Sequence, residues 1–113
     1  MSTIIYNKLV RDKIPDIIKS SGKTAVCRTL DTEEYLIALD QKLSEECAEY
    51  QTDKNIEELA DILEVLYAIA EARGYSKEEL EQVRSEKAAE RGGFAKRVYL
   101  ERVVETESVH TGE

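Results

Sequence analysis

Four carboxylates stand in two pairs, and the members of each pair are three residues apart. The pairs are Glu46 with Glu49 and, a short interval later, Glu58 with Asp61. Residues three apart on a helix are neighbours on its surface, so each pair presents two carboxylates side by side. Hard cations such as Mg²⁺ and Mn²⁺ take carboxylate oxygens as ligands. The two pairs therefore indicate a divalent-metal site between two neighbouring helices.

The apolar pattern around these acids places some of them toward the core. At about 100° per residue, Glu46 lies roughly 60° from the centre of the apolar stripe of its helix, and Glu49 roughly 120°. Glu45 falls nearly opposite the stripe and is expected to face water. Glu58 projects among apolar residues, and Asp61 borders the same region. An isolated buried carboxylate is costly, so a shared cation explains the pattern.

Two other interpretations of the acid pairs remain open. Glu-x-x-Glu is frequent in charged helices, where the acids form ordinary salt bridges. Asn55 could also cap the second helix, which would make Glu58 the partner in a capping box. In either case the acids would be structural and the chain would be a non-catalytic helical interaction module.

Basic residues near apolar stretches are candidates for binding phosphate oxygens, because Lys and Arg donate charged hydrogen bonds to phosphate. Some stand in the N-terminal segment, some on the inner stripe of the segment from 76 to 91, and one follows a Gly-Gly break. Salt bridging or a solvated surface position is the simpler alternative for each. The candidates are Lys8, Arg11, Lys87, Arg91 and Arg97.

Helical periodicity and end signals predict the elements that carry these residues. Pro15 suits the first turn of a short helix that reaches about Ser20. Capping boxes at Asp31 and Ser76 begin two further helices, and Gly74 ends the helix between them. The predicted helices therefore span about 32–51, 55–73 and 76–91. Residues 24–30 could be extended, and 94–104 could be a helix or a strand.

Length and composition limit the class of protein. The chain has 113 residues and a net charge of −8, which disfavours binding to a nucleic acid polymer. It shows no membrane-spanning or secretion segment, so we expect a cytoplasmic protein. We expect one domain over residues 1–105 and a flexible tail over 106–113, which contains His110. Cys27 and Cys47 lack metal-binding spacing and are expected to be buried, reduced thiols.

The chain resembles the all-α, MazG-like nucleoside triphosphate pyrophosphohydrolases, a superfamily that includes phosphoribosyl-ATP pyrophosphohydrolase. The resemblance covers residues 6 to about 100. The motifs that carry it are Glu45-Glu46-Cys47-Ala48-Glu49, Glu58-Leu59-Ala60-Asp61, the run from Tyr6 to Pro15, Glu86-Lys87 and Arg91-Gly92-Gly93-Phe94. The interval between the two acid motifs is shorter than in the larger members. The small single-domain branch of this superfamily, with its house-cleaning enzymes, is the most similar.

The resemblance implies a helical bundle. Apolar residues cover more than half of the circumference of the predicted helix 55–73, so we expect this helix to be buried on several sides and the core to be completed in a homodimer or a dimer of dimers. The resemblance also implies hydrolysis of a nucleoside triphosphate to the monophosphate and pyrophosphate by attack of water at the α–β phosphoanhydride. Mg²⁺, or Mn²⁺ in its place, would be held by Glu46, Glu49, Glu58 and Asp61. Glu45, or an acid not bound to the metal, would accept the proton of the water. Hydrolysis of phosphoribosyl-ATP is the alternative reaction.

Overall fold

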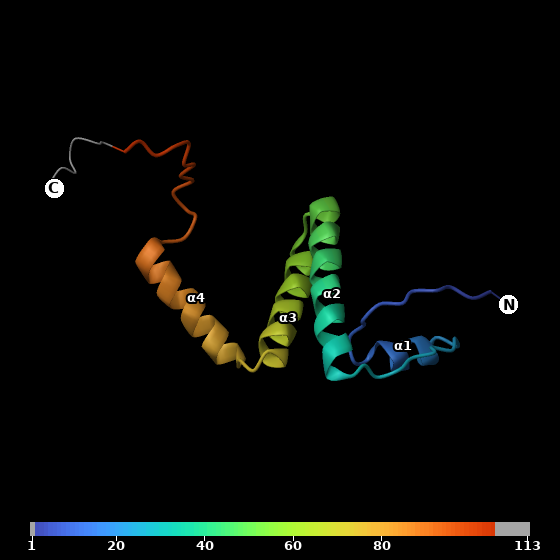
Figure 1. Ribbon diagram of the computed structural model, residues 1–113. Coiled ribbons are helices and arrows are strands. Elements are labelled where there is room, and N and C mark those ends of the chain that lie inside the picture. Colours follow the sequence, from blue (N-terminus) through green and yellow to red (C-terminus); the bar gives the residue numbers. More distant parts are fainter. Residues whose placement is uncertain (1, 106–113) are drawn as a thin grey trace. The chain divides into compact units, whose positions relative to one another are not determined.

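The computed structural model describes residues 2–105, and within them the chain forms four α-helices and no strand (Figure 1). The helices are α1 (Ile14–Ser20), α2 (Thr32–Asp53), α3 (Ile56–Ala72) and α4 (Lys77–Arg91). The all-α prediction is confirmed. Residues 24–30 and 94–104 form neither a helix nor a strand. The predictions for the tail and for His110 concern residues outside the described range.

The helices α2 and α3 lie side by side and form an antiparallel hairpin (Figure 1). Their shared core includes Leu39, which is 2% exposed, together with Val65 and Ala70. The link between them is only Lys54 and Asn55. Lys54 adopts the left-handed conformation, with a φ of 54°, which ends α2 and reverses the chain. This tight turn sets the two acid-bearing helices in register.

The predicted caps are present and explain where three helices begin. The Asp31 side chain accepts a hydrogen bond from the backbone of Glu34, and the Glu34 side chain accepts one from the backbone of Asp31. Ser76 and Glu79 form the same reciprocal pair at the start of α4. At α3, the Asn55 side chain accepts a hydrogen bond from the backbone nitrogen of Glu58. These bonds satisfy N–H groups that have no partner within the helix.

The chain divides into two compact units, one ending at Glu81 and the other beginning at Gln82. The first contains α1, α2, α3 and the first turn of α4. The division falls inside a continuous helix, α4. A single domain over residues 1–105 stays a prediction. No helix in the described part of the chain is long and apolar enough to cross a membrane.

Two expectations about burial are wrong for the chain taken alone. Cys27 and Cys47 are free but exposed rather than buried. Helix α3, expected to be buried on several sides, keeps Ile56, Leu59, Leu63 and Leu66 between 38% and 74% exposed. The reason is the same for Cys47 and α3: in a single chain α2 and α3 cover only one face of each other, although apolar residues occupy more than that face. Cys27 lies in the coil before α2.

Candidate metal centre

The hairpin brings the two predicted acid pairs together. One carboxylate oxygen from each of Glu46, Glu58 and Asp61 lies within 4.8 Å of the others, and the same holds for Glu45, Glu46 and Glu49. Glu46 belongs to both groups and joins the acids of α2 to those of α3. The short interval between the motifs therefore does not separate them, because the two-residue turn folds α3 directly back along α2. We call these five acids, with Asp53, the acid cluster.

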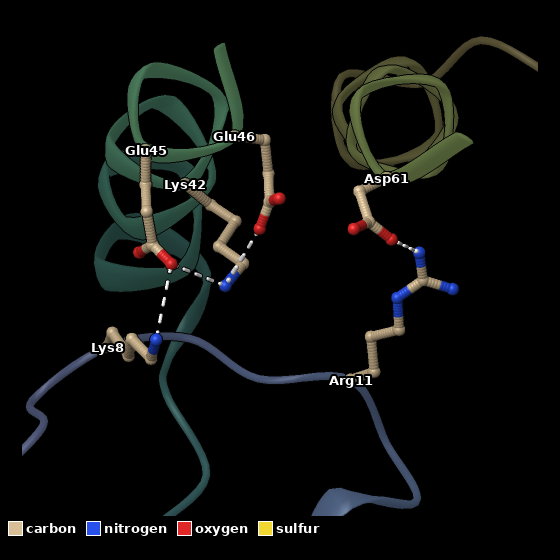
Figure 2. A network of polar contacts seen from close by, with 6 residues as sticks. All are labelled: Lys8, Arg11, Lys42, Glu45, Glu46 and Asp61. Carbon is tan, nitrogen blue, oxygen red and sulfur yellow. Dashed lines mark hydrogen bonds and ion pairs between the residues drawn. The ribbon is translucent and has the colours of Figure 1, made fainter. Parts of the chain in front are cut away.

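Glu46 is buried, and one of its oxygens has no partner. The residue is 6% exposed, and its Oε2 forms an ion pair with Nζ of Lys42 at 3.2 Å (Figure 2). Its Oε1 is buried and accepts no hydrogen bond from any described residue. A buried carboxylate oxygen without a partner costs free energy, which a bound cation would offset. This atom is the observation in the structure that fits a metal ion.

Glu58 is the second buried acid, at 8% exposure. The pKa of Glu58 is raised from 4.5 to about 7. The largest cause is a hydrogen bond with the Asp53 side chain, followed by burial and by the negative charges of Glu49, Asp53 and Asp61. Glu58 therefore keeps a proton to unusually high pH in the metal-free protein. A nearby divalent cation would favour the charged carboxylate.

Lys42 neutralises part of the cluster from within α2. Its Nζ lies 3.0 Å from Oε2 of Glu45, and its side chain is 14% exposed (Figure 2). Burial acts to lower the pKa of Lys42, but the hydrogen bonds and charges of Glu45 and Glu46 outweigh it and raise the pKa. Burial likewise acts to raise the pKa of Glu45, but Lys42 and then Lys8 lower it below its ordinary value. Glu45 is thus held in its charged form.

The N-terminal segment before α1 supplies two more cations. Lys8 donates a hydrogen bond to Oε2 of Glu45 at 3.3 Å. Arg11 donates one to Oδ1 of Asp61, so the segment contacts acids of both helices (Figure 2). Both side chains are well exposed, at 39% and 54%. Exposed ion pairs of this kind contribute little to stability, so they can exchange partners readily.

The sequence patterns located most of these residues and missed two. Glu46 and Glu58 are buried as predicted, and Glu49 and Asp61 lie nearer the edge. The expectation that Glu45 faces water is wrong: its side chain is 28% exposed because Lys8 and Lys42 draw it into the cluster. Lys42 was missed, although its place four residues before Glu46 is a signal for a helical ion pair.

Asp53 was also missed, because its contact with Glu58 depends on the turn between the helices. The cations Lys87, Arg91 and Arg97 belong to the second unit and are exposed. There Arg91 lies 3.7 Å from the carboxylate of its neighbour Glu90. Of the predicted phosphate-binding residues, Lys8 and Arg11 lie at the acid cluster. A phosphate-binding role for the other three stays a prediction.

Comparison with known proteins gives one partial relative. An uncharacterised protein of Mycolicibacterium smegmatis is 60% identical to this chain over 42 residues, which are 37% of the chain and 43% of that protein. The match therefore spans less than half of either protein, and it names no activity. No protein-family model and no solved structure matches the chain.

Proposed function

We propose that this protein is a Mg²⁺-dependent, MazG-like nucleoside triphosphate pyrophosphohydrolase that forms the nucleoside monophosphate and pyrophosphate. Non-canonical nucleotides are the proposed substrates, as in the house-cleaning enzymes that the sequence resembles. The observation that carries the proposal is the unpartnered Oε1 of buried Glu46, set beside carboxylates from both helices. Such an arrangement is costly without a cation and suits the oxygen ligands that Mg²⁺ or Mn²⁺ prefers.

In this proposal the acids of α2 and α3 have two roles, metal binding and acceptance of a proton. Glu46, Glu49, Glu58 and Asp61 would hold the metal ion. When bound, Mg²⁺ supplies positive charge that polarises the triphosphate and favours attack at the α–β phosphoanhydride. Glu45, or a carboxylate not engaged by the metal, accepts the proton of the attacking water. The lowered pKa of Glu45 keeps this carboxylate charged and free of a proton, but it also makes Glu45 a weaker base than an ordinary glutamate.

The cations balance the charge of the substrate. Lys8 and Arg11 contact Glu45 and Asp61 through exposed ion pairs, which a triphosphate would compete for. Transfer of these side chains from carboxylate to phosphate would bind the substrate where the metal-holding acids lie.

A non-catalytic interaction module is the second candidate, and the ion pairs favour it. Lys8, Arg11 and Lys42 each contact an acid of the cluster, so part of the negative charge is already balanced within the protein. An interaction module would leave Oε1 of Glu46 without a partner among residues 2–105. Phosphoribosyl-ATP hydrolysis is the alternative reaction for an enzyme with the same site.

The direct test is a screen of canonical and modified nucleoside triphosphates, and of phosphoribosyl-ATP, for release of pyrophosphate with and without Mg²⁺. Glu58→Gln should lower the rate by at least about 100-fold. Loss of an outer-shell partner of a metal site already costs up to about 100-fold, and loss of a direct ligand should cost no less. Glu57→Gln is the matched control, because Glu57 is the exposed neighbour of Glu58 on α3. Equal rates in both variants would show that the assignment of Glu58 to the metal site is wrong. Absence of pyrophosphate release from every substrate would favour the interaction module.

A further inference from the structure

Lys42 differs from Lys8 and Arg11 in two ways: it belongs to a helix that carries the acid cluster, and its side chain is more deeply buried. It stands on α2 beside two acids of the same helix, and its side chain is 14% exposed, against 39% for Lys8 and 54% for Arg11. Its Nζ contacts Oε2 of both Glu45 and Glu46, at 3.0 and 3.2 Å (Figure 2). The ammonium group is therefore part of the cluster itself.

Both acids that Lys42 contacts belong to groups that could hold a metal ion. Glu45 and Glu46 lie together in one such group, and Glu46 also in the other. A Mg²⁺ ion binds carboxylate oxygens at about 2.0–2.1 Å. An ion bound at Glu46 would thus stand within a few ångströms of Nζ, and like charges at that separation in a half-buried site repel strongly. The ammonium group and a divalent cation are alternatives for the same negative charge.

We propose that Lys42 is the internal counter-ion of the metal-free acid cluster and that a divalent cation displaces its ammonium group from Glu45 and Glu46. Lys42 then has two effects. It holds the carboxylates together in the metal-free protein, where they would otherwise repel one another. It also weakens divalent-ion binding in the absence of nucleotide, so that the ion is taken up chiefly with a triphosphate, whose oxygens add ligands. This inference rests on the proposed metal site.

Calorimetric titration of the nucleotide-free protein with Mg²⁺ and with Mn²⁺ tests it. Lys42→Met should bind either ion about tenfold more tightly than the parent, within the usual range of coupling between competing ligands. Without metal the same variant should unfold at a lower temperature. Lys42→Arg keeps the charge and should bind the ions as the parent does. Arg28→Met, which breaks the exposed pair with Glu34 outside the cluster, is the control for loss of one positive charge.

Nuclear magnetic resonance of the parent protein gives a second measurement that does not depend on the variant's folding. The side-chain ammonium signal of Lys42, assigned by its loss in Lys42→Arg, should be protected from exchange with water in the metal-free protein. Saturation with Mg²⁺ should remove that protection. Unchanged or weaker metal binding in Lys42→Met, or protection that persists with Mg²⁺, overturns this inference alone. Failure of both the parent and Lys42→Met to bind either ion overturns the metal site and, with it, both proposals.

Discussion

Glu46 and Glu58 are both buried acids, and they reach that state with different partners. Glu46 pairs through one oxygen with Lys42, and its other oxygen has no partner in the described part of the chain. Glu58 lies among other acids and shares a hydrogen bond with Asp53. Burial therefore costs free energy at both positions unless a cation binds or a proton is retained.

The raised pKa of Glu58 predicts an unusual dependence of stability on pH. Between its ordinary pKa of 4.5 and its folded value of about 7, the folded protein binds more protons at Glu58 than the unfolded chain does. The contribution of Glu58 to the free energy of unfolding therefore falls as pH rises through this window. Glu45 acts in the opposite sense, but its lowered pKa places its effect below pH 4.5.

Urea unfolding without divalent ions, measured from pH 4.5 to 8, checks this prediction. Glu58→Gln cannot titrate, so its stability relative to the parent should increase as pH rises toward 7 and then level off. Glu57→Gln should follow the parent curve. A constant difference between Glu58→Gln and the parent across this range would contradict the raised pKa.

Single residues also show how far the sequence could predict the site. Glu58 was identifiable because helical geometry alone turns it toward apolar neighbours. Glu45 was misplaced because the same geometry ignores Lys8, which comes from 37 residues earlier in the chain. Contacts that depend on two distant segments, or on the turn between helices, have no periodic signal in the sequence.

At the scale of elements, the first turn of α3 links helix capping to the site. Asn55 accepts a hydrogen bond from the backbone of Glu58, and the carboxyl group of that residue lies in the acid cluster. Asp31 makes the equivalent bond at the start of α2, away from the cluster. The two caps therefore provide a matched comparison of stability and metal binding.

Asn55→Ala and Asp31→Ala should each destabilise the protein by about 1 kcal/mol, the usual cost of losing a cap. Only Asn55→Ala should also weaken Mn²⁺ binding, because it loosens the turn that positions Glu58. Thermal unfolding and Mn²⁺ titration of both variants make the comparison. An equal effect on Mn²⁺ affinity would mean that the cap at Asn55 does not position the site.

Helix boundaries were predictable because capping residues mark them locally. The starts predicted near Asp31, Asn55 and Ser76 agree with the observed first residues of α2, α3 and α4. The extent to which α3 is covered was not predictable, because periodicity shows which residues prefer burial but not what packs against them. The apolar segment 94–104 forms neither a helix nor a strand, and its composition alone did not predict this.

At the scale of the whole molecule, the uncovered apolar stripe of α3 predicts self-association. Ile56, Leu59, Leu63 and Leu66 recur at intervals of three and four residues, so they lie along one side of the helix, and all are exposed in the single chain. Most oligomers of a single chain are symmetric dimers or assemblies of dimers. We therefore expect a homodimer or a dimer of dimers.

Sedimentation velocity at micromolar concentration measures this association. Leu63→Lys should shift the protein toward the monomer, because a charge buried in an apolar interface is costly. Glu64→Lys, at the exposed neighbouring position, should leave the assembly unchanged. A parent protein that sediments as a monomer at all concentrations would contradict the expected oligomer.

Phosphorus nuclear magnetic resonance of a triphosphate that is turned over tests the central claim most directly, because it identifies which bond is broken. The protein is incubated with Mg²⁺ and the triphosphate in water enriched in ¹⁸O. The proposal predicts that pyrophosphate and the monophosphate appear together, with ¹⁸O on one of these two products, and that neither forms when Mg²⁺ is removed. Formation of a diphosphate with inorganic phosphate, or a spectrum that does not change for any triphosphate tested, would contradict it.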